Sequence, residues 1–176
     1  MDTGLLIVRL VVGLVVAAHG VQILFGKFDG LGLQRSAAAF DRIGYRPGKL
    51  FATAAGLSES SGGLLLAAGL VTPLAAAAIV SVMFAAALSS HLKNGFWITN
   101  GGYEYTLTLG LVAMGIGFIG PGSYSLDHLL GWTLSGIWWG LLAFALALAA
   151  TIPIEAYRRE RIQGVTGNHQ STSTAE

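Results

Sequence analysis

The sequence predicts an all-α fold, a polytopic transmembrane helical bundle, and three observations lead to that prediction. Charged residues make up only 11% of the chain, whereas soluble globular proteins carry about 25%. Hydrophobic residues reach 53%, and the mean hydropathy is +0.66. Five apolar stretches of 17 to 21 residues follow one another, and a helix of about 20 residues crosses the hydrocarbon core of a bilayer. No segment alternates with the two-residue period of a membrane β-barrel strand.

The five stretches are expected to be transmembrane helices. They are residues 5–25, 51–70, 74–92, 103–119 and 132–152. Only Val71, Thr72 and Pro73 separate the second from the third, and a proline suits the first turn of the helix that follows. The fourth stretch is the shortest and the richest in glycine, so its ends are the least sharply defined.

The segments outside the spans differ in character. Residues 33–43 of the long first loop are amphipathic, which predicts a short helix lying at the membrane interface. The sequence GYRPG at residues 44–48 breaks that helix before the second span. Residues 153–176 form the C-terminal segment, which becomes polar and aperiodic after Ile162. We therefore expect residues 153–176 to be a mostly disordered tail.

The distribution of cationic residues predicts the orientation of the chain. Nine of the ten Lys and Arg residues fall in the first loop, the loop between the third and fourth spans, or the tail; the exception is Arg9. With five spans these segments share one face, and the positive-inside rule makes that face cytoplasmic. We expect a multi-pass protein of a prokaryotic plasma membrane, with its N-terminus outside and its C-terminus in the cytoplasm.

Charge and cysteine content exclude several classes of function. A net charge of +1 without a clustered basic face is not typical of nucleic-acid binding. The chain has no cysteine, which excludes disulfides, thiolate nucleophiles and cysteine-ligated zinc or iron–sulfur sites. Redox or sulfur chemistry would therefore need a partner protein that carries the redox centre.

Ionisable residues inside the spans are the candidate functional residues, because a charge at mid-bilayer costs ~2.5–3.5 kcal/mol and needs a partner. Glu59 lies close to the predicted midplane, and His19 lies in the inner half of the first span. His91 and Glu104 flank the loop between the third and fourth spans. A compact bundle would bring these four residues together. Imidazole and carboxyl groups can exchange the protons of a quinone or of a proton relay.

Structural roles remain open for the same residues. Arg9 can extend to the outer interface, and His91 and Glu104 can contact lipid headgroups. His19 can donate to a backbone carbonyl, and Glu59 can be a protonated carboxyl hydrogen-bonded to the neighbouring serines or to a facing helix. Haem ligation by the two histidines is disfavoured by their different depths, and the acidic residues and histidines show no metal-binding spacing.

Pairs of small residues four positions apart predict where helices approach closely. Four such pairs occur in the spans: Gly13 and Ala17, Gly56 and Ser60, Ala113 and Gly117, and Gly136 and Gly140. We expect these pairs to serve packing rather than chemistry.

The order of several motifs resembles the DoxX family. The motifs are Arg9-x3-Gly13-x5-His19-Gly20, then Glu59-x2-Gly62-Gly63 leading to Thr72-Pro73, then His91 with Gly101-Gly102-Tyr103-Glu104, and finally Gly120-Pro121-Gly122 with Ser125-Leu126-Asp127. The resemblance covers residues 4–128. It implies a four-helix membrane bundle, so residues 1–130 would be a DoxX-like domain and residues 131–152 an additional transmembrane helix.

The resemblance implies a redox context but supplies no catalytic residue. Similar proteins include the small subunit of a thiosulfate:quinone oxidoreductase and a membrane protein that joins a superoxide dismutase to a sulfurtransferase. We therefore expect a membrane subunit of a quinone-linked oxidoreductase or redox complex, in which His19, Glu59, His91 and Glu104 hold a quinone. His19 and Glu59 would contact the quinone, no cofactor would be intrinsic, and a membrane or soluble redox protein would be the partner.

Two other functions remain open. A non-catalytic anchor would recruit soluble partners through the basic loop and tail, and its intramembrane residues would matter only for stability. A small proton-coupled transporter would use Glu59 as the proton carrier, and a homo-oligomer would supply the symmetry that the single chain lacks.

Overall fold

A computed structural model describes the backbone of residues 2–173 and the side chains of residues 2–163. The described residues are helical and contain no strand, which confirms the predicted all-α class. The helices are α1 (Asp2–Phe25), α2 (Gly32–Arg42), α3 (Gly48–Ala68), α4 (Thr72–Ala86), α5 (Glu104–Ile119), α6 (Leu126–Leu129) and α7 (Ile137–Ser173). Three short segments follow α4: the π-helix η1 (Ala87–His91) and the 3₁₀ turns η2 (Leu92–Asn94) and η3 (Ile98–Asn100).

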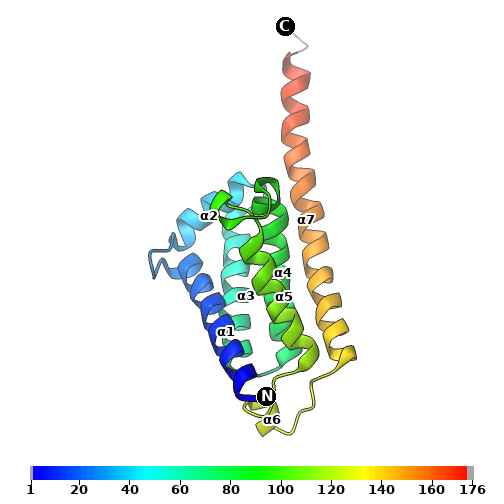
Figure 1. Cartoon of the computed structure of the whole chain (residues 1–176). Helices are drawn as coiled ribbons and strands as arrows, with labels where there is room; N and C mark the ends of the chain where they lie inside the picture. Colours follow the sequence, from blue (N-terminus) through cyan, green and yellow to red (C-terminus); the bar gives the residue numbers. More distant parts are fainter. Residues whose placement is uncertain (1, 174–176) are drawn as a thin grey trace.

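The five long helices α1, α3, α4, α5 and α7 lie side by side and alternate in direction (Figure 1). α2 and the connection between α4 and α5 lie at the upper end in that view, and α7 continues beyond it. The α3–α4 turn and α6 lie at the lower end. The upper end and the adjoining part of α7 carry nine of the ten cationic side chains, so we call it the basic end: Lys27, Arg35, Arg42, Arg46, Lys49, Lys93, Arg158, Arg159 and Arg161.

Three helices are long and apolar enough to cross a membrane: α1, the segment Thr72–Asn94, and Ile137–Gln163 of α7. α5 is apolar but shorter, with 16 residues. α3 has 21 residues, but Glu59 and its neighbouring serines lower its hydropathy. The fold is thus an all-α helical membrane bundle, in which the shorter α5 and the more polar α3 pack among the apolar helices.

Small residues bring α1 and α3 into close contact. A Cβ atom on Gly13 would lie 2.5 Å from the carbonyl oxygen of Gly63, and one on Gly63 would lie 2.5 Å from the backbone nitrogen of Ala17. A Cβ atom on Gly20 would lie 2.5 Å from the backbone nitrogen of Ser60. The two helices therefore meet backbone to backbone, as the predicted small-residue pairs of α1 and α3 require.

The other two predicted small-residue pairs, Ala113 with Gly117 and Gly136 with Gly140, differ in their packing. Gly117 packs against α4, where an added Cβ would lie 3.1 Å from the Cβ of Ala76. Gly140 packs against the ring of Phe118, but Gly136 precedes α7 and has nothing within 4 Å of an added Cβ. Gly136 is therefore not part of a helix contact, and its φ of +101° instead suits the turn before α7.

The turn between α3 and α4 is short because its residues fit their backbone angles. Gly69 ends α3 with φ +63°, a left-handed conformation that costs glycine little. Pro73 lies in the first turn of α4, where its missing N–H loses no hydrogen bond. The predicted three-residue connection is confirmed to within two residues of each helix end.

The C-terminal part of the chain differs most from the prediction. The last long helix begins at Ile137 rather than residue 132, because residues 131–136 form an extended turn. α7 then continues to Ser173, so the expectation of a mostly disordered segment from residue 153 is not met over residues 153–173. Residues 174–176 of that expected tail lie outside the described residues. Side-chain contacts of Glu155 and Arg158 hold the first part of this segment on the bundle.

Candidate functional site

Glu59 lies halfway along α3 and faces the interior of the bundle, with only 3% of its surface exposed. Its atom Oε2 is buried without a hydrogen-bond partner, and so is the hydroxyl of the adjacent Ser60. Among the described residues no other buried side-chain nitrogen or oxygen lacks a partner. The expectation that the neighbouring serines hydrogen-bond this carboxyl is wrong, because Ser61 donates to Leu57 and Ser60 packs on Gly20.

A tyrosine on α5 lies near this carboxyl, and a histidine on α1 lies beside the tyrosine. The rings of His19 on α1 and Tyr105 on α5 are 6.4 Å apart between centroids, and Tyr105 interacts electrostatically with Glu59. Neither His19 nor Tyr105 forms a hydrogen bond or ion pair within the described part of the chain. His19, Glu59 and Tyr105, which we call the Glu59 site, thus bring three polar groups from three helices together without internal partners.

The other two predicted residues lie elsewhere and already have partners. His91 Nδ1 is 2.8 Å from the carbonyl oxygen of Gly101, and the Glu104 carboxylate accepts a 2.9 Å hydrogen bond from the backbone N–H of Ile98. Both residues hold the connection between α4 and α5 in shape at the basic end. No hydrogen bond or ion pair joins either residue to Glu59 or His19 within the described residues. His91 and Glu104 therefore bind local backbone groups in the loop, and a shared site of all four residues stays a prediction.

Arg9 forms a buried network at the opposite end of the bundle. The guanidinium is 1% exposed and donates to the carbonyls of Leu66 and Ala67 at the end of α3, at 3.2 and 3.1 Å. It also donates to Pro121 and Tyr124 in the connection after α5. The expectation that Arg9 extends to the outer interface is wrong, because the carbonyl ends of α3 and this connection solvate its charge inside the protein.

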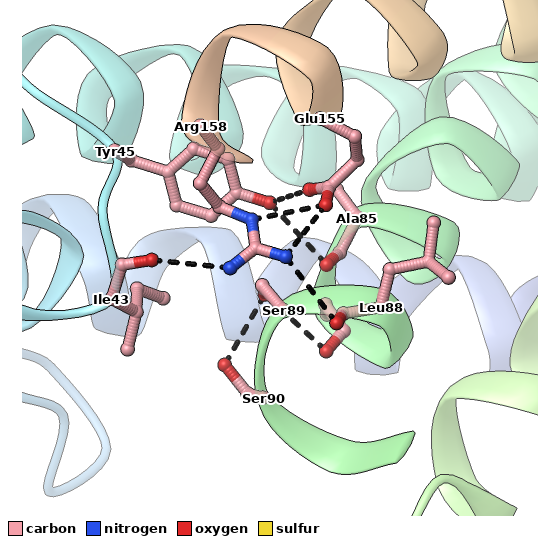
Figure 2. Close-up of polar contacts among 9 residues, drawn as sticks. Ile43, Tyr45, Ala85, Leu88, Ser89, Ser90, Glu155 and Arg158 are labelled. Atoms are coloured by element: carbon pink, nitrogen blue, oxygen red, sulfur yellow. Dashed lines mark hydrogen bonds and ion pairs between the residues drawn. The ribbon is translucent and has the colours of Figure 1, made fainter. Parts of the chain in front are cut away.

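A second buried network holds α7 against the basic end (Figure 2). The Tyr45 hydroxyl donates to Glu155 Oε1, and Arg158 forms an ion pair with Glu155 at 2.9 Å. Arg158 also donates to the carbonyls of Ile43 and Leu88. Burial raises the pKa of Tyr45, and the hydrogen bond to Glu155 raises it further, so the phenol keeps its proton. These contacts connect the first loop, η1 and α7.

The buried polar groups of the two networks have protein partners, whereas the buried carboxyl of the Glu59 site has none among the described residues. This difference separates structural from functional roles. Arg9, Glu155 and Arg158 all bind protein groups, so their roles are structural. Glu59 is equally buried and has no such partner. A buried polar group without a partner is costly in an apolar interior and points to a ligand or a proton-transfer role. The described residues include no group of three or more His, Asp or Glu side chains that could hold a metal ion.

No role was predicted from the sequence for Tyr105, Glu155, Arg158 or Asp127. The sequence indicates the roles of these residues to different degrees. Tyr105 shows no such indication, since a tyrosine near the end of a span fits the interfacial belt equally well. Glu155 and Arg158 are spaced three apart, which is a helical ion-pair spacing that could have been noticed. Asp127 appeared in a motif, but its partners in α4 are 55 residues away in the chain.

Comparison with known proteins supports the family resemblance. The family model described as DoxX matches residues 4–92, just over half of the chain. The match runs from α1 through η1 and includes His19 and Glu59, whereas Tyr105 and α7 lie beyond it. No curated protein and no solved structure matches the chain. The match over half of the sequence, on an all-α membrane bundle, shows that this chain belongs to the DoxX family.

Proposed function

We propose that this protein is the membrane subunit of a quinone-linked oxidoreductase or membrane redox complex, with the quinone ring bound at the Glu59 site. The observation that supports the proposal is the buried Glu59 carboxyl, which has no hydrogen-bond partner among the described residues. A quinone carbonyl accepts a hydrogen bond from a protonated carboxyl, and a hydroquinone hydroxyl donates one to a carboxylate. The same side chain therefore suits both forms of the ligand.

Reduction of a quinone to a hydroquinone takes two electrons and two protons. Glu59 and His19 are groups that can supply or accept these protons, because carboxyl and imidazole side chains are the usual general acids and bases of proteins. The chain has no cysteine to hold an iron–sulfur cluster or to accept sulfur. The two electrons therefore come from a redox centre on a membrane or soluble partner protein.

We propose that the basic end of the bundle faces the cytoplasm of a prokaryotic cell. Nine of the ten cationic residues lie at this end or in the adjoining part of α7, which agrees with the positive-inside rule for short loops. The N-terminus is then outside and the C-terminus inside. A redox partner that docks on the cytoplasmic side would contact α2, the α4–α5 connection or the extension of α7.

A second candidate function, a non-catalytic anchor for soluble partners, is favoured by one observation. α7 continues well beyond the other helices at the basic end (Figure 1), and its residues Arg159 and Arg161 are exposed. Such an extension can present a binding surface to a soluble protein. In this case the Glu59 site would have no ligand, and partner binding would depend on Arg159 and Arg161 instead.

Quinone titration of the purified protein in lipid nanodiscs tests the proposal. We expect saturable binding that falls at least about 5-fold in Glu59→Ala, because a buried quinone carbonyl left without its hydrogen-bond donor costs about 1–3 kcal/mol. Glu104→Gln is the matched carboxyl control, since Glu104 caps a loop at the basic end, and it should bind quinone normally. Equal binding by Glu59→Ala and the unmodified protein would contradict the proposal. A Glu59-dependent proton flux without quinone binding would favour a transporter.

A further inference from the structure

The three residues of the Glu59 site form a gradient of exposure from the bundle interior to its surface. Glu59 is buried, Tyr105 is 39% exposed, and His19 is exposed. α1 is one of the helices long and apolar enough to cross a membrane, so the exposed ring of His19 faces lipid within this span, whereas Tyr105 lies near the end of α5. An imidazole without a hydrogen-bond partner is unfavourable against lipid. The position of His19 beside Tyr105 is explained if a lipid-soluble ligand with polar groups passes between them.

The pairs of helices around Glu59 differ in how closely the two helices pack against each other. α1 and α3 meet backbone to backbone at Gly20 and Ser60. α3 and α4 are in contact at Gly62, where an added Cβ would lie 3.1 Å from the Cβ of Ala78. α4 and α5 also pack along their length, with Met83 against Gly110. The contact between α1 and α5 is slight by comparison.

We infer that a ligand reaches the Glu59 site laterally between α1 and α5, which make few contacts, and passes His19 and Tyr105. Tyr105 is a ligand-binding residue there, and its hydroxyl forms a second polar contact to the ring of the ligand. The class of ligand is a quinone with an apolar tail, whose ring reaches Glu59 while the tail remains in the lipid between α1 and α5. This inference rests on the proposed function and adds the route of access and a residue that sequence reasoning missed.

The structure offers a matched pair of variants for the test. Tyr105→Phe removes one hydroxyl and keeps the ring that faces His19. Tyr103→Phe, two residues earlier, removes a hydroxyl from a ring that packs against Phe96 in the loop. Quinone affinity is measured for both variants in nanodiscs. We expect Tyr105→Phe to bind about 5- to 10-fold more weakly, as for the loss of one hydrogen bond, and Tyr103→Phe to bind as the unmodified protein does.

Photolabelling with a quinone that carries an aryl azide tests the route itself. Adducts are mapped by peptide mass spectrometry, and we expect them on α1 and α5 near His19 and Tyr105. Unchanged affinity in Tyr105→Phe, or adducts confined to α4 or α7, would overturn the inference while leaving Glu59-dependent binding intact. An unmodified protein that binds no quinone at all would overturn the proposed function and this inference together.

Discussion

Asp127 on α6 binds Thr72 at the first residue of α4 through two hydrogen bonds. Its Oδ2 atom accepts from the Thr72 backbone N–H at 3.0 Å and from the Thr72 hydroxyl at 2.7 Å. Oδ1 accepts from the backbone N–H of Val71 at 2.7 Å. α4 therefore takes its N-terminal cap from a helix much later in the chain, and the negative charge also lies favourably at the positive end of the α4 dipole.

This cap predicts that substitution of Asp127 lowers the stability more than substitution of Thr72 does. Asp127→Ala leaves three donors unpaired, two of them buried, and removes a negative charge that interacts favourably with Arg9, so we expect the free energy of unfolding to fall by about 3 kcal/mol. Thr72→Val removes one hydrogen bond and should lose about 1 kcal/mol. Thr72→Ser keeps the hydroxyl and is the control. Titration with SDS in mixed micelles measures these differences, and an equal effect of all three variants would contradict the capping role.

The Arg9 network predicts that lysine cannot replace this arginine. Four carbonyl oxygens around the guanidinium use its planar array of N–H donors, whereas an ammonium group has three donors in a different geometry. We expect Arg9→Lys to lower the free energy of unfolding by at least about 2 kcal/mol. The measurement is the same SDS titration. A lysine variant as stable as the unmodified protein would mean that a positive charge alone, without the planar donor geometry, satisfies the carbonyl oxygens around this side chain.

The Tyr45–Glu155 hydrogen bond predicts that α7 is held on the bundle from the first loop. Tyr45→Phe removes a buried donor to a carboxylate, so we expect faster hydrogen–deuterium exchange in α7 and a loss of about 1.5–3 kcal/mol. Tyr157→Phe is the control, because the Tyr157 hydroxyl donates to Arg46 at 2.8 Å in an exposed position. Exchange that rises equally in both variants would argue against a specific role for Tyr45.

The contact between α1 and α3 predicts opposite effects for two glycine substitutions. Gly63→Ala places a methyl group 2.5 Å from the backbone nitrogen of Ala17, so the helices must separate and we expect a loss of about 1–3 kcal/mol. Gly115→Ala on α5 meets nothing within 4 Å and should be neutral or gain up to about 1 kcal/mol in helix propensity. A neutral Gly63→Ala variant would contradict the close helix contact.

Much of the fold could be predicted from the sequence because membrane helices are encoded locally. The length and hydropathy of each apolar stretch predicted α1, α3, α4 and α5 to within three residues, except that α4 ends in a π-helix and a 3₁₀ turn. The extension of α7 was missed because a polar segment gives no hydropathy signal. The contacts of Glu155, Tyr157 and Arg158 with the first loop and η1 show that its first part belongs to the bundle.

The candidate site could be predicted only in part, because a pattern identifies residues but not their partners. Glu59 and His19 were found since ionisable residues inside a span are rare. His91 and Glu104 looked equivalent, yet each binds a backbone group within ten residues of itself, which a loop with several glycines makes possible. Arg9 was misjudged because its partners at Pro121 and Tyr124 are more than 110 residues away.

The quinone content of the protein purified gently from its native membrane tests directly whether the Glu59 site binds a quinone. Solvent extraction and mass spectrometry would be applied to the unmodified protein and to Glu59→Ala, with Glu104→Gln as the control. We expect a quinone near one per chain in the unmodified protein and in Glu104→Gln, and its loss in Glu59→Ala. Lipids alone in all three samples, or a quinone retained without Glu59, would contradict this expectation.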